Sequence, residues 1–162
     1  INDMEIIMQF RLDYYDIANK TKNKELKSAF NIQKINDFIQ SGNLLLSVAK
    51  HKSIIVYHVY FYGSKNSVLI YSISNFRDKI ENRNLAGQIN KLLHFKDMLF
   101  LKNEGIEKYD WGNLSNNEKP NGIDKFKLSF GGYVSEGFNV FYGNSMIGKL
   151  LVCMKKYIIN KI

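Results

Sequence analysis

The chain has few of the residues that cross-link a fold or bind zinc. Its 162 residues include one cysteine, one proline and three histidines. The single cysteine, Cys153, excludes a disulfide within the chain and is expected to be a small core or interface residue. The histidines have no zinc-binding spacing, so we predict no metal site. His94, within a helical pattern, is expected to be a hydrogen-bonded core or interface residue.

Long apolar runs and a targeting segment are also lacking. The longest apolar run falls within residues 54–62, far short of the roughly 18 residues that a membrane-spanning helix needs. The first residues do not combine a basic segment with an apolar one. We therefore expect no transmembrane segment, no secretory signal and a cytoplasmic location.

Basic and aromatic residues are abundant. The sequence has 23 Lys and Arg against 15 Asp and Glu, a net charge of +8, with 11 Phe and 10 Tyr. This charge attracts nucleic acids, phosphorylated cofactors or acidic membranes, and a solvated lysine-rich surface explains it as well. The basic residues are dispersed, which argues against a nucleic-acid module. A hydrophobic content of 45% supports one domain over residues 1–162 with a real core.

Hydrophobic patterns predict strands enclosed by helices. A first strand is expected over residues 4–12, and Asp13 is expected to cap a helix from Tyr14. There follow a helix over 31–40, strands over 44–49, 53–62 and 67–76, a long helix over 84–103, a strand over 106–111, a short helix over 123–130, a strand over 133–142 and a last helix over 145–162. This order predicts an α/β or α+β fold with one mostly antiparallel sheet and helices on its faces.

Two short motifs follow the long helix. Residues 109–112 read YDWG, the expected end of a buried strand, and residues 126–131 read FKLSFG, a short helix that ends in glycine. Over about residues 67–142 the chain resembles the FemAB-like transferases, a branch of the GNAT (N-acetyltransferase-like) superfamily. The resemblance implies a GNAT-like fold and the transfer of an activated acyl or aminoacyl group to an amine.

The resemblance also suggests donors and acceptors. Full-length FemAB enzymes contain two GNAT-like domains and transfer amino acids from aminoacyl-tRNA to peptidoglycan precursors, whereas this chain has room for one such domain. The implied donor is acetyl-CoA or an aminoacyl-tRNA, and the implied acceptor is a cell-wall precursor, a sugar or another small amine. GNAT enzymes that use acetyl-CoA carry Gln/Arg-x-x-Gly-x-Gly/Ala before the long helix. Residues 83–88 read RNLAGQ, with Ala86 at the first glycine. A non-catalytic GNAT-fold binding module is therefore the alternative.

The second motif supplies the first candidate site residues. Phe126 and Lys127 match the Phe-Lys pair that is implicated at the aminoacyl-donor site of FemAB-like enzymes. A lysine held there stabilises a phosphate, or the oxyanion formed when an amine attacks an ester or thioester. The alternative is that Phe126 and Phe130 anchor the core while Lys127 points to solvent.

The first motif and the start of the long helix supply the others. Asp110, a carboxylate at a strand end in an expected apolar setting, must be hydrogen-bonded, and it is either a base for the acceptor amine or a turn cap. Tyr109 and Trp111 either wall an acceptor pocket or pack in the core. Arg83 and Asn84 stand where free helix N–H groups attract phosphate, with an exposed loop arginine as the alternative.

Overall fold

The structure is a computed structural model that describes residues 4–20, 31–75, 83–115, 118–135 and 145–150. They fall into two units, Ile1–Lys119 and Pro120–Ile162. The sequence predicts that residues 1–162 form one domain. That the two units together make up this domain stays a prediction.

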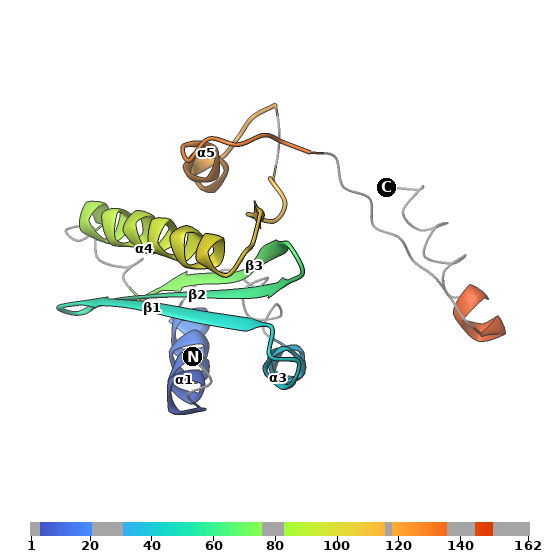
Figure 1. Ribbon diagram of the computed structural model, residues 1–162. Helices are drawn as coiled ribbons and strands as arrows, with labels where there is room; N and C mark the ends of the chain where they lie inside the picture. The colour runs from blue at the N-terminus through green and yellow to red at the C-terminus, as the bar shows by residue number, and fades with distance from the viewer. Residues whose placement is uncertain (1–3, 21–30, 76–82, 116–117, 136–144, 151–162) are drawn as a thin grey trace. The chain divides into compact units, whose positions relative to one another are not determined.

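A four-stranded sheet forms the centre of the first unit (Figure 1). β1 (Leu44–His51), β2 (Ile54–Gly63) and β3 (Asn66–Ser74) are an antiparallel meander. The helix α4 (Arg83–Asn103) then crosses over to β4 (Lys108–Asp110), which pairs in parallel with β3. The order β1-β2-β3-β4 confirms the predicted α+β class with a mixed, mostly antiparallel sheet flanked by helices.

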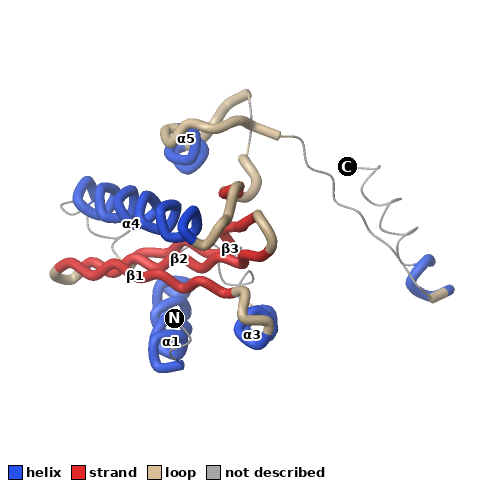
Figure 2. Tube along the Cα trace, viewed as in Figure 1, coloured by secondary structure: helices blue, strands red, loops and turns tan. Residues whose placement is uncertain are grey.

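Helices cover both faces of this sheet. α1 (Met4–Lys20) and α3 (Ile32–Gln40) lie on one face and α4 lies on the other (Figure 1). β2 lies between β1 and β3 (Figure 2), and its side chains alternate between the two layers. Toward α1 it presents Tyr57 and Val59, and toward α4 it presents Ile54, Val56, His58 and Tyr60. The polar residues of β2 therefore lie on the α4 face.

The first described residues form a helix and not a strand. α1 buries Ile7, Phe10 and Tyr14, which are three and four positions apart and so lie on one helical face. Asp13 lies inside α1 rather than at its start. The predicted strand over residues 4–12 and the predicted cap are therefore wrong, because the buried positions repeat with helical and not strand periodicity.

Up to residue 130, the other predicted elements differ from the structure only at their ends. Asn31 caps α3 by accepting a hydrogen bond from the Lys34 N–H at 3.0 Å. In the second unit, α5 (Gly122–Leu128) begins with a capping box in which Asn121 and Asp124 accept each other's backbone N–H. Of the predicted final strand and helix, residues 133–135 have no regular structure and residues 146–150 are helical. Their remaining parts, and Cys153, lie outside the described residues.

Candidate functional site

A buried polar cluster lies between the sheet and α4. Its members are His58 and Tyr60 of β2, His94 and Asp97 of α4, and Tyr109 of β4, and we call them the His–Asp–Tyr cluster. The first four are buried, and Tyr109 is half-buried. Strand alternation directs His58 and Tyr60 to one face, and a helical turn separates His94 from Asp97. The parallel pairing of β4 with β3 then brings Tyr109 to the same place.

Asp97 is the acceptor that joins β2 to α4. Its Oδ2 atom lies 2.7 Å from Nδ1 of His58 and accepts a hydrogen bond from the Tyr60 hydroxyl, also at 2.7 Å. On the other side of the His58 ring, Nε2 lies 2.7 Å from the amide oxygen of Asn90. A carboxylate buried without such partners is strongly destabilising. The two donors therefore explain how Asp97 is accommodated in the core.

Tyr109 and His94 complete the network. The Tyr109 hydroxyl lies 2.7 Å from the Tyr60 hydroxyl and 2.8 Å from Nδ1 of His94. Burial, together with the nearby His58, lowers the pKa of His94 to about 2, so its ring is neutral and its Nδ1 contact with Tyr109 is a hydrogen bond between two uncharged groups. Burial raises the pKa of Tyr109, and the Asp97 charge adds to this while the Tyr60 contact opposes it. Tyr109 is therefore a protonated hydroxyl that donates.

Two histidines and a carboxylate also raise the question of a metal ion. The ligand atoms of His58, His94 and Asp97 lie within 4.8 Å of one another. An imidazole binds metal in its ring plane at about 2 Å, yet the two rings are stacked with 3.7 Å between centroids. A single ion cannot lie in both planes, and the 2.7 Å contact of His58 with Asp97 is a hydrogen-bond length. In this conformation the three side chains therefore belong to a hydrogen-bond network. The absence of a metal stays a prediction.

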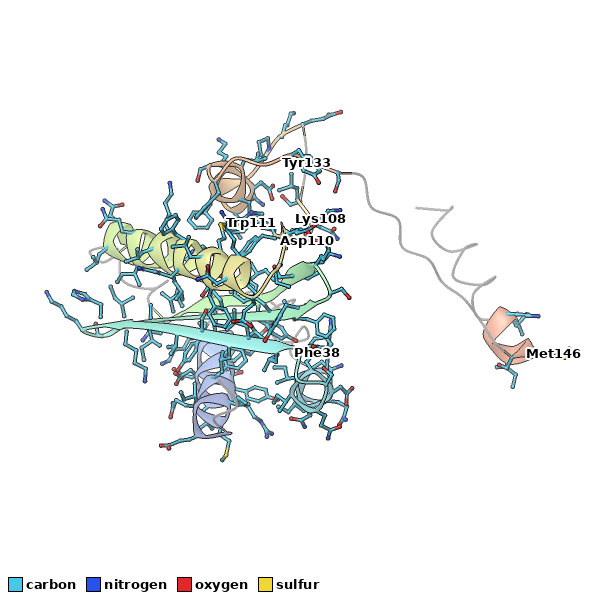
Figure 3. All side chains as sticks on the ribbon, viewed as in Figure 1. Phe38, Lys108, Asp110, Trp111, Tyr133 and Met146 are labelled. Atoms are coloured by element: carbon cyan, nitrogen blue, oxygen red, sulfur yellow. The ribbon has the colours of Figure 1, made fainter. Side chains whose placement is uncertain are left out.

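The YDWG motif lies at this cluster. Lys108, Asp110 and Trp111 belong to β4 and the residue after it (Figure 3). The indole ring of Trp111 lies 4.6 Å from the His94 ring and 4.8 Å from the Tyr109 ring, measured between centroids. Tyr109 and Trp111 are thus brought together, as an aromatic edge of the cluster.

Asp110 has a different environment from the predicted one. Its side chain is exposed, so the expected apolar setting is wrong. Its Oδ1 atom accepts a hydrogen bond from the Gly112 N–H at 2.7 Å, and Gly112 has a positive φ of 71°. Asp110 therefore makes the predicted turn-cap contact and keeps its carboxylate at the surface.

An open hollow adjoins the cluster. It has a volume of about 570 Å³ and is lined by Met98, Leu101, Lys102, Gly105, Ile106, Glu107, Lys108 and Tyr109. Tyr109 belongs to both the hollow and the cluster. A molecule bound in the hollow can therefore contact a residue whose hydroxyl belongs to the buried network.

The predicted donor-binding residues lie elsewhere in the chain. Arg83 and Asn84 begin α4, and Asn84 is exposed. Phe126 and Lys127 belong to α5 in the second unit, where Lys127 is half-buried. The Phe126 and Phe130 rings meet edge to face at 5.3 Å. Phe126 therefore packs on Phe130, which follows the end of α5, and its role at a donor site stays a prediction.

Ala86, which stands where acetyl-CoA-binding enzymes have a glycine, is a core residue. Its side chain is buried against Ile54 and Val56 of β2. The first turns of α4 are therefore fixed by packing on the sheet.

Most of the cluster was not expected from the sequence. His58, Tyr60 and Asp97 were not proposed as site residues, and His94 was expected only as a satisfied core or interface histidine, which its burial confirms. A signal was present, because His58 and Tyr60 are polar positions two apart in an otherwise apolar strand.

Among the described residues, no helix is both long enough and apolar enough to cross a membrane. Comparison with known proteins finds no family model that matches the chain, and no significant match to a curated protein or to a solved structure.

Proposed function

We propose that the chain is an acyl- or aminoacyl-transferase of the FemAB/GNAT type that transfers an activated acyl group to an amine. The position of Tyr109 within the YDWG motif carries this proposal, because the residue lines the hollow while its hydroxyl belongs to the buried cluster. The order of antiparallel strands, a long helix, a further strand and a short helix supports it, because a GNAT-like fold is expected to have these elements in this order.

The chemistry requires stabilisation of negative charge. The acceptor nitrogen attacks the carbonyl carbon of an ester or thioester, so a C–N bond forms and the C–O or C–S bond breaks. The nitrogen gives up a proton, the leaving oxygen or sulfur takes one, and charge develops on the carbonyl oxygen. Tyr109 suits this charge because its raised pKa keeps the hydroxyl protonated, and rotation of that O–H away from the cluster gives the oxyanion a hydrogen-bond donor. Tyr60 and His94 hold that hydroxyl in place, which is catalysis by positioning.

Residues next to Tyr109 serve the acceptor. The carboxylate of Asp110 is exposed and directly follows Tyr109, so it takes the role of a base or an anchor for the amine. Trp111 walls the acceptor pocket. The acceptor is a cell-envelope or sugar precursor or another small amine, and the reaction is assigned to the cytoplasm.

The candidate donor residues lie on α5 and on α4, and each pair is proposed by itself. Lys127 stabilises the oxyanion or a donor phosphate, with Phe126 beside it on α5. Arg83 and Asn84 meet a donor phosphate at the N-terminus of α4. The donor is acetyl-CoA or an aminoacyl-tRNA, and no metal takes part.

Two lysines of α5 provide a matched test. Purified protein is incubated with labelled acetyl-CoA or aminoacyl-tRNA and a panel of amines, and the labelled amide is measured. Lys127→Ala is expected to reduce transfer by about 100-fold or more. Lys125→Ala, an exposed neighbour on the same helix, is expected to retain it. Full activity of Lys127→Ala contradicts the role of Lys127, and no transfer by the wild type from either donor contradicts the proposal itself.

The second candidate is a binding module that keeps this fold without catalysis. The burial of Ala86 favours it, because a side chain packed on the sheet occupies the position where glycine lets the backbone approach a pyrophosphate. Calorimetric titration with acetyl-CoA separates the two candidates. Saturable micromolar binding supports an acetyltransferase, whereas failure to bind either donor supports the module.

A further inference from the structure

The outward face of α4 carries an exposed apolar stripe. Leu92, Phe95 and Leu99 are 59%, 53% and 42% exposed. Their spacing of three and four residues places them on one side of the helix. The opposite side of α4 packs on the sheet, where four of its residues are buried: Ala86, His94, Asp97 and Leu101. α4 therefore has a second apolar face that does not contribute to the core of its unit.

The same face is cationic. Lys96 and Lys102 are exposed and flank the stripe on opposite sides, at about 40° from Leu92 and about 60° from Leu99 for 3.6 residues per turn. α4 contains one acidic residue, Asp97, which is buried. No acidic side chain of α4 therefore reaches this face, and the net charge of +8 adds attraction for anions at longer range.

We propose that this face docks on the surface of an anionic phospholipid membrane. Leu92, Phe95 and Leu99 enter the boundary between headgroups and acyl chains, and the two lysines meet lipid phosphates. An apolar stripe of Leu and Phe with lysines beside it is typical of helices that lie in a membrane interface. Lysine stems extend along apolar surface while their ammonium groups reach the headgroups. An anionic bilayer thus complements both the apolar and the charged parts of the face.

Other binding partners would complement either the charged or the apolar part of this α4 face, but not both. A nucleic acid would pair with Lys96 and Lys102 but would leave Leu92 and Leu99 against a charged backbone. A second copy of the same face would cover the stripe but would bring like charges together. The combination of apolar centre and cationic edges therefore favours the anionic lipid surface.

α1 supplies a comparison within the same chain. Met8 and Leu12, four residues apart, are 62% and 63% exposed. The charges around them are mixed, because Glu5, Arg11, Asp16 and Lys20 are all exposed on this helix. α1 thus also exposes apolar side chains, but the charges around them are of both signs. It is a matched control for apolar exposure without charge complementarity.

Vesicle co-sedimentation of the full chain tests the proposal. We expect the protein to sediment with vesicles of phosphatidylcholine mixed with phosphatidylglycerol, to stay in solution with phosphatidylcholine alone, and to be released by salt. The triple variant L92S/F95S/L99S is expected to lose binding. K96Q/K102Q is expected to bind about 25-fold more weakly, since each lysine near an anionic surface contributes about fivefold. M8S/L12S is expected to bind like the wild type.

All of the substituted side chains are exposed, so the variants are expected to fold, and their circular dichroism and melting curves check this. Absence of sedimentation with the mixed vesicles overturns the proposal, as does equal binding to neutral vesicles or an equal loss in M8S/L12S. A concentration-dependent dimer in ultracentrifugation that the triple variant abolishes, without vesicle binding, assigns the face to a second copy. Loss of tRNA binding in K96Q/K102Q, again without vesicle binding, assigns it to nucleic acid. Each of these two results also overturns the proposal.

Discussion

The imidazole rings of His58 and His94 lie stacked, with 3.7 Å between their centroids and 20° between their planes. Two protonated rings in this buried position would repel each other. The lowered pKa of His94 removes that conflict, because its ring stays neutral. The hydrogen bonds agree with this division, since Nδ1 of His94 meets hydroxyl groups while Nδ1 of His58 meets the Asp97 carboxylate. The stacked pair therefore has two chemically different members.

His94 makes the stability of the protein depend on pH. Its pKa is about 2 in the folded state against an ordinary value of 6.5, so the unfolded chain binds one more proton at acidic pH. The stabilisation is present above pH 6.5 and decreases as the pH falls toward 2. We expect a loss of about 2 kcal/mol from this group between pH 7 and pH 5. Urea unfolding, followed by Trp111 fluorescence, measures it.

His94→Gln is expected to remove this component of the pH dependence. His51→Gln, at an exposed position on β1, is expected to leave it unchanged. Equal stability of the wild type at the two pH values would show that His94 is accessible to protons in the folded state.

Replacing Asp97 is expected to destabilise the folded protein. Asp97→Asn substitutes a neutral amide for the carboxylate that accepts from His58 and Tyr60, and we expect a destabilisation of about 3 kcal/mol. Asp110→Asn is the control, because the side chain is exposed and the amide oxygen can still accept from Gly112. Its effect is expected to stay within about 0.5 kcal/mol. Denaturant titration compares them, and similar losses would contradict a special role for the buried carboxylate.

Tyr109→Phe separates a structural hydroxyl from a catalytic one. The variant keeps the ring contact with Trp111 and loses the contacts with Tyr60 and His94. A stability loss of about 1 kcal/mol is expected. If the proposed transfer uses this hydroxyl, the rate falls by about 100-fold, well beyond the change in folded population. Tyr133→Phe, at an exposed position, changes neither quantity. Undiminished transfer by Tyr109→Phe would leave the hydroxyl with a structural role only.

Two neighbouring positions at the start of α4 are expected to respond in opposite directions. Ala86→Gly restores the glycine of the acetyl-CoA pattern, but it removes a buried methyl group and costs about 1 kcal/mol in helix propensity alone. Gly87→Ala is expected to stabilise by up to about 1 kcal/mol, because a Cβ atom there would meet nothing within 4 Å. Melting temperatures measure both changes. A more stable Ala86→Gly variant would contradict the packing role of Ala86.

The strands and α4 could be predicted because their signals are local. The β-branched and aromatic residues of β2 and the turns on either side define the meander, and the apolar period of α4 extends over several turns. The strand predicted in place of α1 is wrong because adjacent apolar residues, Ile6, Ile7 and Met8, resemble a strand in a short window. Its helical period becomes visible only when Phe10 and Tyr14 are included.

The cluster could not be predicted because its contacts are not local. His58 and Asp97 are separated by 39 positions, and Tyr60 and Tyr109 by 49. Their meeting depends on which face of the sheet α4 covers and on the side from which β4 joins β3. A single sequence does not contain that information, although the polar residues on otherwise apolar faces indicated that partners were needed.

These separations also bear on how long the native state persists. The meander forms from strands that are neighbours along the chain, whereas the hydrogen bonds of Tyr109 form only after the crossover through α4 has brought β4 to β3. Contacts between distant segments require the closure of large loops and therefore form late in folding. Weakening them is expected to speed unfolding while the folding rate changes little. The network at the YDWG motif is thus expected to influence the lifetime of the folded protein more than the time it takes to form.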